Sequence, residues 1–388
     1  MKNDLKRRVW VEIDLGRISR NYAKIAAAVR PAAVLAVLKA NAYGLGVIPY
    51  ARALSRTDCA GFGVAEPFEA LQLVEWLAAN PTGAEPVSVQ ILSSVLPDEI
   101  PAMVEAGVVL PVIDTATARR ISRAAARLHV TAKVHFKLDT GMGRLGIRAV
   151  DAPSVIREVK ALPNLDCEGI FSHCPMAYDP ENPFTEDQID LFVGIVKDAR
   201  RHGITFRKVH IAASDAINNF PRCAKPPFTQ VRTGINLHGS FDPYGRKALN
   251  VESVLTLKTR VAQVRDLPAG ATLGYGRTWC LAKKTRVATI SAGYADGLPL
   301  ALTNRGHVLI GGVPCPIIGR ISMDYTTVDV SHAPGTKPGD EVVCLGEAGG
   351  HRITPDDWAA LKGTHAYDII CSFGNRVEHV YRSDSLES

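Results

Sequence analysis

Eight short apolar segments recur through the first two thirds of the chain, and this repetition constrains the fold more than any other feature. Most are continuous apolar runs rather than alternating ones, which is typical of parallel strands covered on both faces. Helical patterns such as EPFEALQLVEWLAA and DQIDLFVGIVKDARRHG separate several of them, and the second ends at Gly203, a residue typical of helix caps. We predict strands over residues 34–38, 60–64, 87–92, 108–113, 132–138, 167–172, 207–211 and 229–233. Eight strands alternating with helices over roughly 230–240 residues predict an α/β fold, a (β/α)8 TIM barrel.

The sequence pattern changes near residue 245. Segments such as VLTLKTRVAQVRDL, HVLIGGVPCPIIG and DEVVCLG are rich in strand-forming residues and are separated by Gly and Pro turns. We therefore predict a barrel domain over 1–244 and a β-rich C-terminal domain over 245–388. The segment RVWVEI, at the end of the first ten or so residues, is a candidate for an extra strand of the β-rich domain. No long linker or repeat interrupts the chain, so we expect the domains to pack tightly.

Composition and charge exclude several classes of partner. The hydrophobic fraction of 46% is enough for a full core, and the net charge of +6 is spread thinly along the chain, which argues against a nucleic-acid partner. No apolar run is long enough to cross a bilayer, and the basic start has no apolar stretch typical of a secretory signal. The eight cysteines form no CxxC pair, which indicates free thiols rather than disulfides or a metal site. We expect a cytoplasmic protein without a metal.

Polar residues stand at the ends of five predicted strands. Lys39 closes the first strand, in VLAVLKANAYGLG, and Lys137, His173, Ser214 and Arg232 stand at or just after the ends of four others. Active sites of this fold are built at the carboxyl ends of the strands. Desolvation there lowers the pKa of a lysine and makes a neutral amine available for Schiff-base chemistry. Taken alone, Lys39 would more often be a lysine that reaches solvent from a strand end; the repetition of the pattern favours the functional interpretation.

The segment after the eighth strand, RTGINLHG, is a candidate phosphate site. Gly234 lets a ligand approach its backbone closely, and the adjacent N–H groups can donate to a phosphate. Barrels often bind phosphate after strands seven and eight, where Ser214 could add a hydroxyl donor. The same glycine could instead only form a turn.

Together these motifs resemble alanine racemase, the barrel-type (fold type III) pyridoxal-phosphate-dependent family. The resemblance covers nearly the whole chain, and its first and last segments are highly specific. It rests on VLKANAYGLG at 37–46, KLDTGMGRLG at 137–146, SH at 172–173, HIAAS at 210–214, VRTGINLHG at 231–239, GYGRTW at 274–279, SAGYADGLP at 291–299 and GRISMDYTTVDV at 319–330. It implies a racemase that converts L-alanine to D-alanine with pyridoxal 5'-phosphate.

The resemblance also implies roles for individual residues. Lys39 would bind the cofactor covalently and act as one catalytic base, while Arg232 would face the pyridine nitrogen with His173 beside it. Since arginine can only donate, that nitrogen would stay unprotonated. The phosphate group would be bound by Tyr43, Ser214, Gly234, Ile235 and Tyr367.

A homodimer with shared active sites follows from the same resemblance. Tyr275 would be the second base, supplied by the partner subunit together with Met323, through its backbone N–H, and Asp324. One base on each face of the α-carbon allows inversion, provided that both lie within hydrogen-bond reach. Lys137 and Arg144 would repel each other as two desolvated cations. The resemblance resolves this with a carbamate on Lys137, which leaves Arg144 to bind the substrate carboxylate.

Some residues depart from the family pattern. His238 stands where the family usually has tyrosine, Ala213 stands where many members have asparagine, and CPMAYD follows His173. These departures lie around the phosphate end and the outer part of the site. They therefore bear on the affinity of the site and on its substrate range rather than on the class of reaction. Read without their motifs, Tyr43 and Tyr367 would be packing aromatics, Asp324 a turn cap and Met323 core filler.

Other functions remain open. A racemase of serine or of broader specificity needs only a different substrate pocket. A fold-III amino-acid decarboxylase should carry a catalytic cysteine near an acidic pair and a Gly-rich phosphate loop, neither of which is convincing in this sequence. A non-catalytic pyridoxal-phosphate-binding protein would resemble the barrel alone, so the β-rich C-terminal part argues against it.

Overall fold

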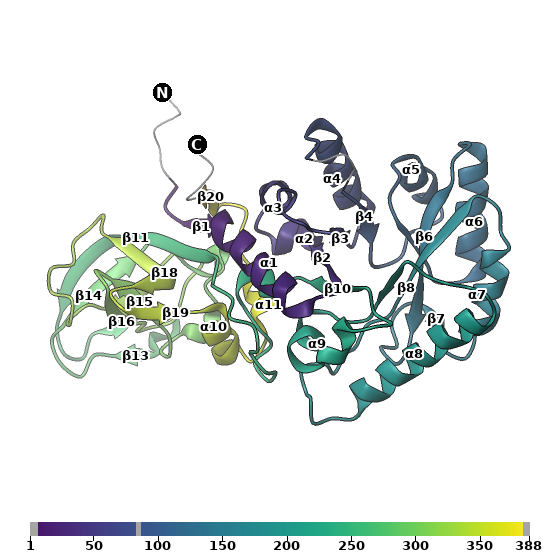
Figure 1. Ribbon diagram of the computed structural model, residues 1–388. Coiled ribbons are helices and arrows are strands. Elements are labelled where there is room, and N and C mark those ends of the chain that lie inside the picture. Colours follow the sequence, from purple (N-terminus) through teal and green to yellow (C-terminus); the bar gives the residue numbers. More distant parts are fainter. Residues whose placement is uncertain (1–6, 83–86, 383–388) are drawn as a thin grey trace. The chain divides into compact units, whose positions relative to one another are not determined.

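The computed structural model describes residues 7–82 and 87–382, which form two compact units (Figure 1). The barrel unit comprises Ile18–Leu237 and Tyr244–Val251. The β unit comprises the described residues up to Arg17, residues 238–243, and the described residues from Glu252 onward. The chain thus passes between the units several times.

The barrel unit is built on eight parallel strands, and each of the eight predicted strands is found. Several are buried along their whole length, as expected for parallel strands covered on both faces. The strands are β2 (Ala33–Val37), β3 (Gly61–Val64), β4 (Val89–Ile91), β5 (Leu110–Val112), β6 (Ala132–Asp139), β8 (Leu165–Phe171), β9 (Lys208–His210) and β10 (Gln230–Thr233). A two-residue strand, β7 (Ile147–Arg148), pairs with the end of β6.

Two parallel ladders and two smaller links close the barrel. One ladder runs β10-β2-β3-β4 and the other β5-β6-β8-β9. An isolated parallel bridge between Gln90 and Val109 joins β4 to the start of β5. On the other side, the backbone N–H of Thr229 donates to the carbonyl of Val209 at 3.0 Å, between β10 and β9. Because all strands are parallel, their carboxyl ends meet at one mouth of the barrel.

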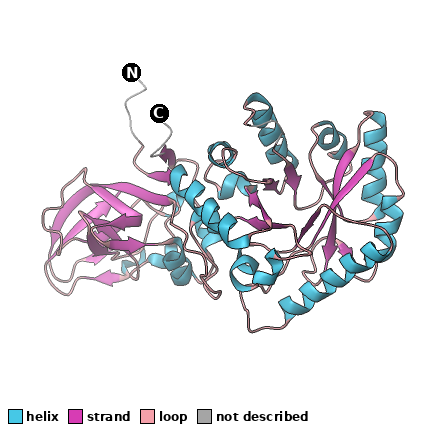
Figure 2. Ribbon diagram, in the orientation of Figure 1, coloured by secondary structure: helices cyan, strands magenta, loops and turns pink. Residues whose placement is uncertain are grey.

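Helices follow most of the strands and lie outside them, shown in cyan around the magenta strands in Figure 2. The predicted helical segments correspond to α4 and α8, and Gly203, two residues beyond α8, has a φ of 74° that suits a glycine. The helices of this unit are α1 (Leu15–Val29, which begins in the β unit), α2 (Lys39–Tyr43), α3 (Val47–Leu54), α4 (Pro67–Ala79), α5 (Ile100–Glu105), α6 (Thr115–Arg127), α7 (Ala152–Lys160), α8 (Phe184–Arg201) and α9 (Ser214–Asn219).

The β unit contains a branched nine-stranded sheet with the main order β16-β15-β18-β11-β1-β20. Its longest strand, β11, alternates buried and exposed residues at its start, as expected for a sheet with one face on a core. The strands are β1 (Trp10–Asp14), β11 (Leu255–Leu267), β14 (Thr285–Ile290), β15 (His307–Ile310), β16 (Val313–Pro316), β17 (Thr326–Asp329), β18 (Glu341–Ala348), β19 (His351–Ile353) and β20 (Glu378–Arg382). A hairpin of β12 (Thr272–Leu273) and β13 (Trp279–Cys280) and the helices α10 (Pro355–Lys362) and α11 (Ala366–Ile370) complete the unit.

Strand β1 ties the start of the chain to the β unit. Trp10 lies opposite Lys258 in the antiparallel β11 and opposite Glu378 in the parallel β20. The RVWVEI segment therefore supplies an inner strand of this sheet, whereas residues 1–6 lie outside the described part of the chain.

Candidate active site

Lys39 lies just after β2 and begins a turn with left-handed backbone. The four residues that follow it have positive φ values of 54°, 55°, 52° and 60°, although none is glycine. The left-handed conformation costs an L-residue roughly 1–2 kcal/mol. Backbone strain of this kind persists only where surrounding contacts impose it, and it is frequent at functional sites. The strained turn therefore supports Lys39, at its start, as a candidate functional residue.

Side chains from α4 and from the turn itself hold this conformation. The backbone N–H of Asn41 donates to Oε1 of Glu69 at 3.0 Å, and Oε2 of Glu69 accepts from the N–H of Ala65 at 3.0 Å. The Asn41 side chain accepts from the N–H of Val47 at 2.8 Å. Glu69 was missed by the sequence reasoning. Its position in the EPFE start of a helix, where a capping carboxylate is expected, is the signal that could have found it.

Tyr43, Ser214 and Gly234 meet at the same mouth of the barrel. The N–H of Gly234 donates to Oγ of Ser214 at 3.1 Å, and a Cβ added to Gly234 would lie 2.1 Å from the hydroxyl oxygen of Tyr43. Ile235 follows in a short 3-10 turn, and all these side chains are buried. A glycine backbone between two hydroxyl groups forms a cradle that can accommodate a phosphate.

Lys137 lies near the carboxyl end of β6, and its side chain is buried. Its ammonium group donates to the carbonyl oxygens of Leu92 and, at 3.2 Å, Ser93. Burial, followed by the nearby charges of Arg232 and Arg144, lowers the pKa of Lys137 to about 8. At pH 7 roughly a tenth of this amine is therefore uncharged. The uncharged amine is the form that reacts as a nucleophile.

Arg232 is buried and directs four of its five N–H donors to protein acceptors. One terminal nitrogen donates to the carbonyls of Ser172 at 2.7 Å and Ile211 at 2.9 Å. The other donates to Nδ1 of His210 at 2.8 Å and to its carbonyl at 3.3 Å. The structure gives the remaining donor, Nε–H, no acceptor among the residues it describes. Burial lowers the pKa of Arg232 to about 10, so the guanidinium stays protonated and Nε–H is available to an unprotonated ring nitrogen.

The ring of Phe171, at the end of β8, lies close to both buried cations. Nζ of Lys137 lies 5.5 Å and Cζ of Arg232 lies 5.6 Å from its centroid, while the His210 ring stacks on it at 5.0 Å. Cation–π contacts of this kind stabilise desolvated charge. Burial and the same cations lower the pKa of His173 to about 3, so this imidazole is neutral. Phe171 was missed because an aromatic residue at a strand end has no signal that distinguishes it from core packing.

The remaining predicted site residues belong to the β unit. Tyr275 is 72% exposed in a one-turn helix over Tyr275–Arg277, and Met323 is 52% exposed, so Met323 is not core filler. Asp324 accepts from Arg376 at 2.6 Å rather than capping a turn. Tyr367, in α11, packs edge-on against His365 with ring centroids 5.3 Å apart. The side chains of Tyr275 and Met323 are thus exposed to solvent in the segments that were predicted to contribute to the site.

Two of the departures from the family pattern have structural consequences. His238 is fully buried, which lowers the pKa of its imidazole to about 3 and keeps it neutral. Ala213 precedes α9 at the N-cap position, where its methyl group can accept no hydrogen bond.

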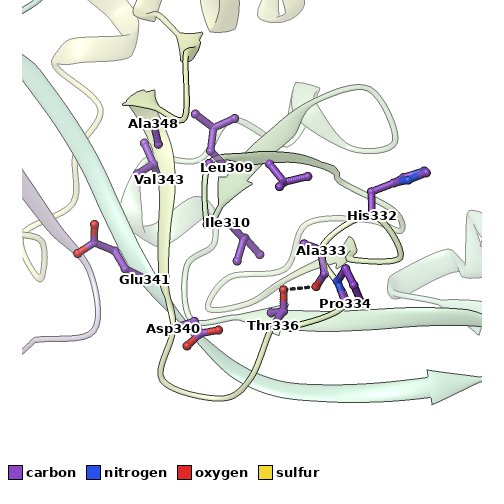
Figure 3. A pocket seen from close by; sticks show the side chains of 14 residues that line it. Leu309, Ile310, His332, Ala333, Pro334, Thr336, Asp340, Glu341, Val343 and Ala348 are labelled. Atoms are coloured by element: carbon purple, nitrogen blue, oxygen red, sulfur yellow. Dashed lines mark hydrogen bonds between the residues drawn. The ribbon is translucent and has the colours of Figure 1, made fainter.

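A separate cavity of about 620 Å³ lies within the β unit (Figure 3). Apolar side chains such as Leu309 and Ile310 line it beside the carboxylates of Asp340 and Glu341 and the imidazole of His332. Neither lysine nor arginine occurs among the described residues of its lining, so it offers no amine for a cofactor aldehyde. The barrel mouth is the better candidate.

The described residues contain neither a candidate membrane span nor a candidate metal site. No helix there combines the length and the apolar character needed to cross a membrane. No group of three or more His, Cys, Asp or Glu side chains in that part of the chain could hold a metal ion.

Comparison with known proteins identifies the family. Residues 13–242 match the family model described as alanine racemase, N-terminal domain, and residues 254–381 match alanine racemase, C-terminal domain. The chain is 34% identical over 387 residues to an alanine racemase of Halothermothrix orenii, covering 99% of both chains. It is 36% identical over 367 residues to one from Syntrophobacter fumaroxidans, covering 94% of this chain and 95% of the relative.

Solved structures agree with this assignment. An alanine racemase from D-cycloserine-producing Streptomyces lavendulae has a TM-score of 0.87 at 31% identity and covers 98% of both chains. An alanine racemase from Bartonella henselae, solved with covalently bound pyridoxal phosphate, has a TM-score of 0.84 at 28% identity, covering 97% of this chain and 100% of that one. The two matched domains and the full-length relatives place this chain in the alanine racemase family.

Proposed function

We propose that this protein interconverts L- and D-alanine with pyridoxal 5'-phosphate as its cofactor. The observation that carries the proposal is that one barrel mouth combines Lys39, the cradle of Gly234 and the unused Nε–H of Arg232. When bound, pyridoxal phosphate supplies a conjugated ring that withdraws electrons from the substrate's α-carbon and so acidifies its hydrogen. The protein's own residues have to bind, orient and exchange protons around that centre.

Each end of the cofactor has matching residues. Lys39 offers an amine for its aldehyde. The backbone at Gly234 and Ile235 with the hydroxyls of Tyr43 and Ser214 fits its phosphate, and we propose Tyr367 as a further phosphate ligand. Arg232 would donate Nε–H to the ring nitrogen, with the neutral His173 nearby. Since this arginine keeps its proton at neutral pH, the nitrogen would remain an acceptor.

Inversion needs one proton donor or acceptor on each face of the α-carbon. We assign these roles to Lys39 and to Tyr275 of the partner subunit. The 72% exposure of Tyr275 and the 52% exposure of Met323 support a homodimer in which both contribute to a neighbouring site. Arg376 binds Asp324 and donates to the carbonyl of Met323 at 3.3 Å, which would hold that segment in place.

Lys137 is proposed to carry a carbamate. A neutral amine attacks carbon dioxide, an N–C bond forms, and the displaced proton leaves to solvent, so a cation becomes an anion. The lowered pKa of Lys137, about 8, supports this because roughly a tenth of the amine is neutral at pH 7. The product would attract Arg144, whose planar fork would then bind the substrate carboxylate. Mass analysis under non-acidic conditions should find one added carboxyl group on Lys137.

All eight cysteines are free thiols, which supports a reducing compartment such as the cytoplasm.

The function is tested by incubating the holoenzyme with L-alanine in deuterated water. We expect D-alanine with deuterium at the α-carbon, lost in Lys39→Ala and retained in Lys133→Ala, a control at an exposed position on β6. Release of carbon dioxide from a basic amino acid would instead indicate a fold-III decarboxylase. Faster inversion of serine or larger amino acids would indicate a different or broader racemase.

A further inference from the structure

A line of buried polar groups crosses the barrel interior away from Arg232. Nη1 of Arg232 lies 2.8 Å from Nδ1 of His210, and Nε2 of His210 lies 3.2 Å from Nδ1 of His135. Nε2 of His135 lies 3.1 Å from Oε1 of Glu168. The four residues come from β10, β9, β6 and β8, and both imidazoles are no more than 2% exposed. The proposed function uses Arg232 but assigns no role to either imidazole of this line or to the carboxylate.

The chemistry at the two ends fixes the position of every proton between them. Arg232 can only donate, so Nδ1 of His210 accepts and its proton is on Nε2. An ionised Glu168 can only accept, so His135 carries its proton on Nε2 and presents Nδ1 as an acceptor. These two assignments agree, because Nε2–H of His210 then donates to Nδ1 of His135. The four groups form one directional chain that begins at a cation and ends at an anion.

Further contacts support this direction. Arg207 donates to Oε2 of Glu168 at 3.1 Å. The hydrogen bond from His135, aided by Arg207, lowers the pKa of Glu168 to about 2 despite its burial. The side-chain amide of Gln90 lies 3.0 Å from Nδ1 of His135 and donates to the same acceptor. Burial lowers the pKa of both imidazoles, so each is neutral with a single ring proton.

The backbone leaves room for this arrangement. A Cβ added to Gly169, next to Glu168 on β8, would lie 2.5 Å from Cε1 of His135. Any other residue at this position would push the ring away from its hydrogen-bond partners.

We propose that Glu168 is a positioning residue for Arg232, acting through His135 and His210 by fixing which ring nitrogens carry protons. This rests on the proposed function in so far as Arg232 binds the cofactor ring. Without an acceptor at position 168, His135 can move its proton to Nδ1, where it meets Nε2–H of His210. If His210 then moves its proton to Nδ1, it opposes the guanidinium donor to donor. Arg232 loses one of its four anchors, and its Nε–H loses its fixed direction.

Neutron diffraction of deuterium-exchanged holoenzyme crystals tests the proton positions directly. We expect deuterium on Nε2 and none on Nδ1 in both His210 and His135. Deuterium on Nδ1 of either ring would overturn the proposal. This readout does not depend on activity, so it separates the proposal from the proposed function, which fails instead if the protein takes up no pyridoxal phosphate.

The role of the carboxylate is tested with Glu168→Leu against Asp166→Asn. Both changes remove one carboxylate partner of Arg207 on the same strand, but Glu168 also accepts a hydrogen bond from His135. Titration of the cofactor-free full-length chain with pyridoxal phosphate should show affinity weakened about tenfold or more in Glu168→Leu, as for a lost buried hydrogen bond. Asp166→Asn should stay within about twofold of the parent. Equal affinities in the two variants would refute the positioning role; if Glu168→Leu does not fold, the neutron map still decides.

Discussion

Replacing Gly234 by alanine would place a methyl carbon 2.1 Å from the hydroxyl oxygen and 3.0 Å from Cζ of Tyr43. Carbon atoms of real side chains essentially never come closer than about 3 Å to a neighbour, so the Tyr43 hydroxyl would have to move by about 1 Å. It has little freedom to do so, because Tyr43 is 4% exposed and ends the left-handed turn that begins at Lys39. Overpacking of this kind costs about 1–3 kcal/mol. Since the same two residues form the cradle, we expect the affinity for pyridoxal phosphate to fall by roughly 5- to 150-fold.

The assay is a titration of the cofactor-free protein with pyridoxal phosphate, followed by visible absorbance, alongside thermal unfolding. Gly194→Ala is the matched control, because a Cβ there meets nothing within 4 Å. Adding Tyr43→Phe to Gly234→Ala removes the clashing oxygen and should restore part of the unfolding temperature, but not the phosphate affinity. An affinity of Gly234→Ala for the cofactor within twofold of the parent's, together with an unchanged unfolding temperature, would show that Tyr43 does not approach Gly234 this closely.

Three further outcomes are expected. Glu69→Ala removes the acceptor for the N–H of Asn41 and should lower the free energy of unfolding by about 1–3 kcal/mol in denaturant titration; Glu75→Ala, at an exposed position of the same helix, should change it by less than about 0.5 kcal/mol. Because the pKa of Lys137 is lowered from 10.5 to about 8, the unfolded state binds more protons between these pH values. Without carbon dioxide and cofactor, stability should therefore rise by up to about 3 kcal/mol from pH 8 to pH 10.5, and Lys137→Met should abolish this contribution. Tyr275→Phe should stop inversion of alanine while leaving the visible absorbance of the bound cofactor; full activity in this variant would refute the two-base assignment.

The barrel could be predicted because most of its strands can be recognised from their local sequence. A strand buried on both faces needs a continuous apolar run, and segments such as 34–38 and 108–113 have one. A polar residue at the carboxyl end of a barrel strand lies at the mouth of the barrel, so Lys39 and Arg232 could be placed there from sequence.

The left-handed turn after Lys39 could not be predicted. The residues Ala40, Asn41, Ala42 and Tyr43 have no local preference for positive φ, apart from asparagine. Their conformation is imposed by a carboxylate from Glu69, 28 residues further along the chain. Local propensity is overruled here by a tertiary hydrogen bond.

The line of hydrogen bonds from Arg232 to Glu168 could not be predicted from the sequence for a related reason. His135 and Glu168 each look like an isolated polar residue within a strand, and their partnership depends on the register between β6 and β8, which includes an irregularity after Val134. No periodicity within one strand contains that information. The β unit presents the same difficulty, since β1 pairs with strands about 250 and 370 residues away in the sequence.

The proposed function depends most on Lys39 being the residue that binds the cofactor covalently. Borohydride reduction of the holoenzyme followed by peptide mass analysis measures this directly, because it converts the lysine–cofactor linkage into a stable adduct. We predict a pyridoxyl phosphate group on the peptide that contains Lys39, and none on those containing Lys137 or Lys133. An adduct on another lysine, or a protein that takes up no pyridoxal phosphate, would contradict the account.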